Sequence, residues 1–281
     1  MDTSYISLIS FIIITIGFYF LKGKLLISPA GDTSGKNYQD YTKSSFIKLA
    51  VYFLAVVLVQ FGINASLITT KCGGSVSKNI GAAFLMTFIP WILIFGVLIV
   101  ILIMFPGFKS AFSNVVGYFA VAGPANTVLS ELLINTDINK AIQADNSSPE
   151  NKQALQSAAD AILKLCGNMS ILINQIVPSN FDEYWQMLKP LMKPEHQTSD
   201  APELKQKLLD LVVRRDNIGE AMWFIYTAVL LISIVQYNLT TRGCVKDVAA
   251  MEKSQQEFLA KEAKINAAKQ QAASQTYTVT N

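Results

Sequence analysis

The chain has 281 residues, of which 51% are hydrophobic and only 15% are charged. Soluble globular proteins carry about 25% charged residues, so this composition argues against a protein surrounded only by water. The net charge of +3 supplies no concentrated basic surface, which argues against nucleic-acid binding. Three cysteines and one histidine, His196, leave few groups for metal or acid–base chemistry. We therefore expect no enzyme, and no catalytic, cofactor-binding or metal-binding residues.

Long intervals without charged side chains predict membrane-spanning helices. The first, near residues 5–21, is close to the minimum length for crossing roughly 30 Å of hydrocarbon. Its positive charges, Lys22 and Lys24, follow the apolar stretch, which is the reverse of a secretory signal peptide. Further spans are predicted near 48–70, 80–105 and 218–241. The sequence therefore predicts an all-α membrane protein with about four crossings.

Two amides interrupt the second predicted span. Gln60 and Asn64 are four residues apart, so they project from the same face of a helix. Leaving these groups unpaired in lipid costs several kcal/mol, and this face is expected to look toward other helices. A polar pore lining is one interpretation, and interhelical hydrogen bonding is the favoured one.

The third span is expected to end at a boundary segment. Pro90 predicts a kink within the span, and Pro106-Gly107 predicts its end. Beyond it, apolar residues recur at helical spacing in a stretch that also contains Ser, Asn and Gly. We interpret 108–122 as an interfacial or re-entrant helix rather than a crossing. Its key residues are Pro106, Gly107, Phe108, Lys109, Phe112 and Phe119.

Two polar regions lie outside the predicted spans. Residues 123–217 have the composition of a helical extramembrane domain, with helix-start signals at Ser148-Pro149, at Asn180 and before Pro202. The segment 22–45 is expected to be irregular, and 242–281 a polar, partly helical tail. The domain joins the fourth span through a charged cluster, Arg214, Arg215, Asp216 and Glu220. One interpretation of this cluster is a coupling site or a site for lipid head groups. The favoured interpretation is a set of ordinary juxtamembrane charges that form ion pairs with one another.

Four crossings place the central domain on the opposite side from the N-terminus and the tail. Basic residues near membrane ends number five on the domain side and four on the other, which favours a cytoplasmic domain. On the domain side they are Lys22, Lys24, Lys36, Lys43 and Lys109. On the other side they are Lys71, Lys78, Arg242 and Lys246. The same topology brings Cys72 and Cys244 to equal depth on the tail side. They are candidates for a disulfide, and the alternatives are free or lipid-modified cysteines.

Several segments carry a resemblance to a known group of proteins. They are Lys71-Cys72-Gly73-Gly74-Ser75, the runs 82–91 and 105–118, and Arg214 to Trp223 at the start of the last span. These segments resemble an internal-membrane protein of the nucleocytoplasmic large DNA viruses, whose icosahedral capsids enclose a lipid membrane. The resemblance implies a virion component that contacts capsid or minor capsid proteins.

The expected function is therefore that of a structural viral membrane protein that anchors the capsid to the internal membrane. Its expected partners are the lipid bilayer, capsid or minor capsid proteins and, in an oligomer, further copies of the chain. The expected location is the internal virion membrane, derived from the host endoplasmic reticulum. The alternatives are a channel or small transporter that uses Gln60 and Asn64, and a component of a viral membrane-fusion apparatus.

Overall fold

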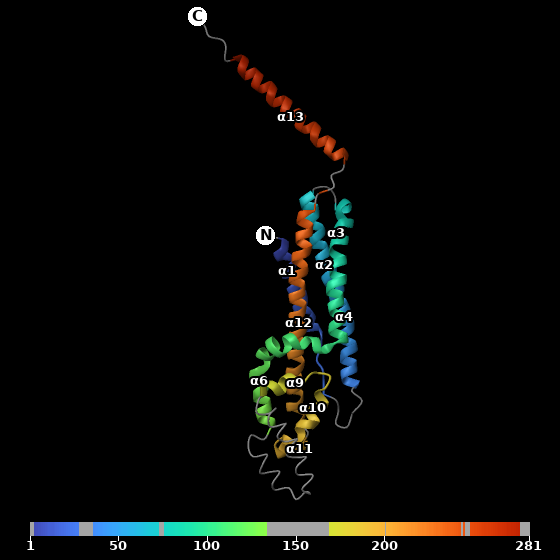
Figure 1. The fold of residues 1–281 in the computed structure, drawn as a ribbon, viewed down its shortest axis with the longest axis vertical. Coiled ribbons are helices and arrows are strands. Elements are labelled where there is room, and N and C mark those ends of the chain that lie inside the picture. The colour runs from blue at the N-terminus through green and yellow to red at the C-terminus, as the bar shows by residue number, and fades with distance from the viewer. Residues whose placement is uncertain are drawn as a thin grey trace.

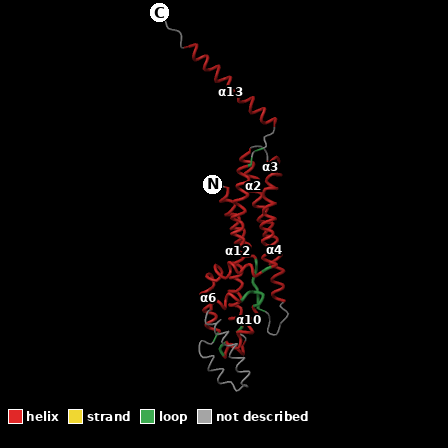
Figure 2. Tube along the Cα trace, in the orientation of Figure 1, coloured by secondary structure: helices red, strands yellow, loops and turns green. Residues whose placement is uncertain are grey.

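The computed structural model describes residues 3–27, 36–72, 76–133, 169–199, 201–242, 244 and 248–275. Helices make up nearly all of the described trace, and loops form short connections between them (Figure 2). Within these ranges the only extended pairing is one bridge between Leu133 and Met192. In this part of the chain, four helices are long and apolar enough to cross a membrane, so the all-α polytopic class is confirmed.

The four long helices form an upright bundle (Figure 1). They are α1 (Thr3–Leu21), α2 (Lys36–Cys72), a third helix assembled from α3 (Val76–Pro90), the π-helix η1 (Trp91–Gly96) and α4 (Val97–Met104), and α12 (Pro202–Thr241). Contacts link α1 to α2 and α12, and link α3 to α2 and α12. Helices α2 and α12 end side by side, whereas α1 and α4 end near the middle of α12 (Figure 1). The chain therefore crosses the bundle in alternating directions.

The outside of the bundle is a belt of exposed apolar side chains. Monomeric soluble proteins rarely expose contiguous apolar surface of this kind, because it is costly in water. The belt is the surface that a bilayer would cover. It includes Ile9, Ile13 and Ile16 of α1, Val51, Leu54 and Leu58 of α2, Ile92, Leu93, Val97 and Val100 of the third helix, and Val229, Leu230 and Ile234 of α12.

Aromatic rings fill the centre of the bundle. Phe11, Trp91 and Phe95 are fully buried, and the Phe11 ring centroid lies 5.9 Å from Trp91 and 5.8 Å from Phe95. Phe224 of α12 adds to this group at 5.4 Å from Phe95 and 5.6 Å from Tyr52 of α2. Such ring pairs contribute about 0.5–1.5 kcal/mol each beyond the area that they bury. The aromatic centre thus holds all four crossings together.

The second and third spans differ in detail from what the sequence predicts. Helix α2 begins at Lys36, twelve residues before the predicted span, so the irregular segment expected over 22–45 is already helical from 36 onward. The reason is tertiary, since Tyr38 and Tyr41 pack against a hydrophobic core outside the bundle. The third span changes to a π-helix directly after Pro90 rather than only bending. A proline nitrogen cannot donate to the preceding turn, and a π-helical register is one way to accommodate the lost hydrogen bond.

The segment after the third span runs across the base of the bundle (Figure 1). It consists of η2 (Pro106–Lys109), α5 (Ser110–Phe112), the π-helix η3 (Ser113–Gly117) and α6 (Tyr118–Leu132). The interfacial segment was predicted to end at 122, whereas α6 continues to Leu132. Its second half buries Ala125, Val128 and Leu129 in the same external core.

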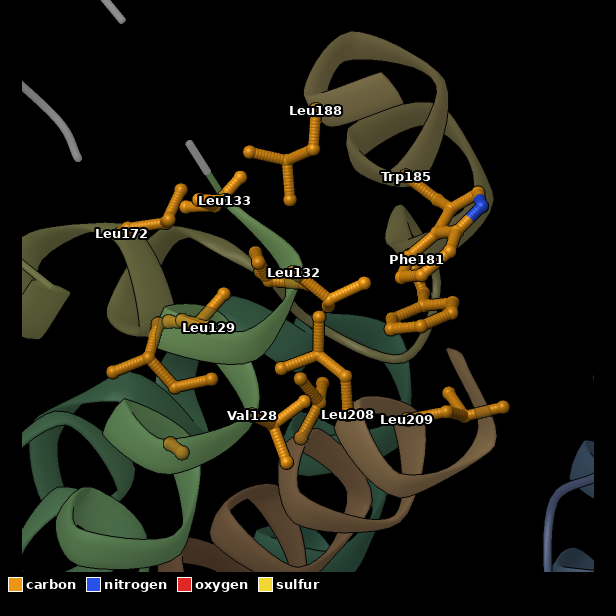
Figure 3. Close-up of a cluster of buried hydrophobic side chains, with 14 of the residues drawn as sticks. Val128, Leu129, Leu132, Leu133, Leu172, Phe181, Trp185, Leu188, Leu208 and Leu209 are labelled. Carbon is orange, nitrogen blue, oxygen red and sulfur yellow. The ribbon is translucent and has the colours of Figure 1, made fainter. Parts of the chain in front are cut away.

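A small helical unit, which we call the head, lies beyond the base of the bundle. Its described part comprises α6, α9 (Met169–Gln175), α10 (Phe181–Leu188), η4 (Lys189–Leu191), α11 (Pro194–Ser199) and the first half of α12. Figure 3 shows Leu129, Leu132 and Leu133 of the α6 end facing Trp185 and Leu188 of α10 and Leu208 of α12. Of the helix expected from Ser148-Pro149 to Pro178, the described residues begin at 169, and the helix ends at Gln175.

Helix α12 belongs to both the head and the bundle. Its 40 residues form one uninterrupted helix of about 60 Å, so the helix that starts at Pro202 enters the fourth span without a break. Helix α13 (Val248–Gln275) follows the bundle, extends away from it in Figure 1 and exposes its described side chains, as expected of a polar tail. The continuous α12 fixes the direction of the head relative to the membrane crossings.

Candidate functional site

Four charged side chains meet where α12 passes from the head into the bundle. Lys22 Nζ lies 2.7 Å from Glu220 Oε1, and Lys109 Nζ lies 2.7 Å from Glu220 Oε2. Lys109 Nζ also lies 3.0 Å from Asp216 Oδ2. We call Lys22, Lys109, Asp216 and Glu220 the junction cluster. It joins three segments of the chain at one level of the molecule.

The junction cluster is shielded from solvent and satisfied by further polar contacts. The side chains of Lys22 and Glu220 are only 7% and 6% exposed. Lys22 Nζ donates to Asn217 Oδ1 at 2.8 Å, and the Tyr19 hydroxyl donates to Glu220 Oε1 at 3.2 Å. Burial of charges on this scale is tolerated only when they are paired and hydrogen-bonded.

Lys109 stays positively charged in this environment. Burial by itself lowers the pKa of a lysine, but the nearby Glu220 and Asp216 carboxylates outweigh this effect and raise the pKa of Lys109 above its ordinary value. The junction cluster contains two basic and two acidic side chains, so its formal charges balance.

The sequence indicated the members of this cluster separately, but not their pairing. Asp216 and Glu220 were singled out, but their expected partners were neighbours within the same charged run. The structure instead pairs them with lysines that directly follow apolar stretches, Lys22 after α1 and Lys109 after the third helix. The position of these lysines could have predicted the pairing, because a cation at the end of a span lies at the same depth as other juxtamembrane charges.

The two arginines of the predicted run have different roles. Arg214 is exposed, whereas Arg215 is fully buried. The Arg215 guanidinium donates to the carbonyl of Ile173, to the carbonyl of Ile176 at 2.8 Å and to Asn174 Oδ1 at 3.4 Å. These acceptors lie at the end of α9, where backbone carbonyls lack partners within the helix. Arg215 thus attaches α9 to α12.

Two glycines allow the interfacial segment to pack directly on α12. A Cβ atom on Gly219 would lie 2.6 Å from Ser113 Cβ, and one on Gly117 would lie 2.6 Å from the Arg215 carbonyl oxygen. Both distances are too short for real atoms. The small residues therefore bring η3 and α12 into backbone contact beside the junction cluster.

Replacing Gly219 with Ala should separate η3 from α12. We expect a loss of about 1–3 kcal/mol of stability, which is the usual cost of overpacking a filled site. The midpoint of thermal unfolding in detergent measures this loss. Gly62→Ala is the matched control, since no atom lies within 4 Å of the added methyl group. Equal midpoints for the two variants would contradict the close packing.

Two of the interfacial residues predicted from the sequence, Phe108 and Phe112, contact Trp223 of α12. Its Nε1 donates to the Phe108 carbonyl at 3.0 Å, and its ring lies 5.4 Å from Phe108 and 5.0 Å from Phe112. Pro106 and Gly107 form the turn that ends the third crossing, and Phe119 is 77% exposed. Indole rings with a polar edge are typical of the boundary between lipid and water.

A cavity of about 440 Å³ adjoins the junction cluster. All four cluster residues line it, together with polar groups from α2 and η3. Apolar side chains of α1, α2, α4 and α12 form its other wall, namely Phe18, Phe46, Leu49, Leu102, Ile103 and Phe224. The site is therefore amphipathic and lies at the end of the membrane-spanning bundle.

The amides of the second span lie deeper, inside the bundle. Gln60 Nε2 donates to the Ser7 carbonyl at 2.8 Å, and Asn64 Nδ2 donates to Thr87 Oγ1 at 3.0 Å. Gln236 Nε2 of α12 donates to Asn64 Oδ1 at 3.1 Å. Gln60 and Asn64 are each only 1% exposed. These contacts connect all four crossings, as interhelical hydrogen bonds do in membrane bundles.

Cys72 and Cys244 form a disulfide at the far end of the bundle, and their Cα atoms are 5.3 Å apart. Beside it, Lys71 Nζ donates to the carbonyls of Leu239 and Arg242 at 3.2 and 2.9 Å. The bond and the lysine fasten the end of α2 to the end of α12. Cys166 lies outside the described residues.

Comparison of the chain with known protein families, with curated proteins and with solved structures finds no match.

Proposed function

We propose that the chain is a structural membrane protein that anchors a protein layer to a lipid bilayer. The resemblance in the sequence implies that this layer consists of capsid or minor capsid proteins over the internal membrane of a large DNA virus. In this proposal the bundle resides in the bilayer and the head is the docking unit.

The observation that supports the proposal most strongly is the mechanical continuity of α12. A single helix extends from the head core to the end of the bundle, with no loop between them. The junction cluster joins this helix to α1 and η2, and Arg215 joins it to α9. A load applied to the head is therefore transmitted to all crossings, which is what an anchor requires.

The proposal is tested by photo-crosslinking in virus particles. A photoreactive amino acid at Met187, an exposed position of α10, should form links to a capsid or minor capsid protein. The same group at Val100, exposed on α4 within the apolar belt, should react with lipid and serves as the matched control. Absence of the chain from particles, or equal protein crosslinking from both positions, would contradict the proposal.

Ion flux through liposomes separates this function from the channel alternative. Gln60 and Asn64 use their amides to bind other helices, so the anchor proposal expects no flux above that of empty liposomes. Flux that disappears after changing Gln60 and Asn64 to Leu would favour the channel instead. The fold of each variant is checked by its helical circular dichroism.

A further inference from the structure

The cavity beside the junction cluster has two chemically different walls. One wall carries the charged groups of Lys22, Lys109, Asp216 and Glu220. The other is apolar and reaches the outer surface of the bundle, because the lining residues Phe46 and Ile103 are 57% and 42% exposed. A ligand that fits both walls must have a polar head and a hydrocarbon part.

The depth of the cavity matches that of a lipid head group. The charged wall lies where the apolar belt ends, at the level of Trp223 and the interfacial segment. The exposed part of the apolar wall comes from Phe46 of α2 and Ile103 of α4, whose exposed faces belong to the belt. A chain leaving the cavity past Phe46 and Ile103 would enter the hydrocarbon region directly.

The charges select the kind of head group. Two ammonium groups face two carboxylates, so the wall has no net charge and offers both signs. An ammonium has three N–H donors, and Lys109 Nζ has contacts with two carboxylates, which leaves a donor for a phosphate oxygen. Asp216 bonds Lys109 through Oδ2, and its Oδ1 is suited to accept from a ligand ammonium. A zwitterion meets these groups without leaving a buried charge unpaired.

We propose that this cavity binds one zwitterionic phospholipid, with its phosphate near Lys22 and Lys109 and its amino group near Asp216. The volume of about 440 Å³ lies within the range of small-molecule sites and holds the head group and the start of the acyl chains. The bound lipid would fill the space between α2, α4 and the interfacial segment. This inference does not depend on a viral or capsid function.

Native mass spectrometry of the full-length chain in detergent tests the site. With added phosphatidylethanolamine, the wild-type chain should retain one lipid. Ser45→Phe places a ring into the cavity and should lower the retained fraction about ten-fold. Ser44→Phe is the matched control. Ser44 is the residue next to Ser45, but it is exposed and does not line the cavity. The control should retain lipid as the wild type does.

A second pair of variants blocks the cavity from its apolar side. Ile103→Trp should reduce lipid retention, whereas Val100→Trp, one turn away and outside the cavity, should not. Thermal unfolding of each variant without lipid shows whether the variant folds. Lipid retention is then compared only among variants that fold. Agreement between the two pairs would support a site at this position.

Three results would overturn the proposal. They are equal retention by Ser45→Phe and Ser44→Phe, tighter retention of phosphatidylglycerol than of phosphatidylethanolamine, and displacement of the lipid by glycerophosphoethanolamine at equal concentration. The second result would contradict the charge match. The third would show that a soluble head group without acyl chains is sufficient.

Discussion

Changing Glu220 to Gln is expected to destabilise the chain by about 3–5 kcal/mol, because it leaves two buried ammonium groups with only one carboxylate. The amide keeps the shape of the side chain but removes its charge. The free energy of unfolding in detergent micelles measures the effect. Glu203→Gln, at an exposed position in the first turn of the same helix, should cost at most about 1 kcal/mol.

A double variant distinguishes lost pairing from general damage at the junction. Combining Glu220→Gln with Lys22→Met removes one cation as well as one anion, and Lys109 keeps its contact with Asp216. The double variant should therefore be more stable than Glu220→Gln alone. A double variant as unstable as the sum of the two single changes would contradict the role of Glu220 as the shared partner.

Loss of the Cys72–Cys244 disulfide is expected to have an effect as large as that of Glu220→Gln. The two cysteines are 172 residues apart, and in the chain-entropy model such a long loop lies toward the upper end of disulfide stabilisation, about 5 kcal/mol. Cys72→Ser, Cys244→Ser and the double variant should have equally lowered unfolding midpoints, because each removes the same bond.

Reducing agent supplies the control for this prediction. Dithiothreitol should lower the unfolding midpoint of the wild-type chain to that of the double serine variant and should leave the variant unchanged. Additive losses in the two single variants would instead mean that each cysteine contributes separately, without a bond between them.

The crossings could be predicted from the sequence because hydrocarbon imposes a simple rule. A helix in lipid cannot carry unpaired charges, so windows without charges marked all four spans. The ends were less accurate, because they depend on tertiary contacts. Lys36 begins α2 because Tyr38 and Tyr41 pack on the head, and no local signal reveals a distant core.

The candidate site was only partly predictable for a similar reason. Asp216 and Glu220 stood out as carboxylates beside a span, but the partner Lys22 is 198 residues from Glu220 in the sequence. Charge pairs on different helices leave no periodic trace in one sequence. The sequence also carried no indication that Gly219 is important, because its importance comes from the close approach of Ser113 on another helix. Arg215 was grouped with the juxtamembrane charges that pair among themselves, whereas the structure buries it against α9.

Labelling in sealed vesicles tests the central claim, that the head and α13 lie on opposite sides of a membrane. Single cysteines replace Met187 in α10 or Leu259 in α13, both exposed, in a chain that has Cys166→Ser and retains the disulfide. A membrane-impermeant maleimide should label only one of the two positions before the vesicles are opened and both afterwards. Labelling of both positions in intact vesicles of uniform orientation would contradict the four-crossing arrangement.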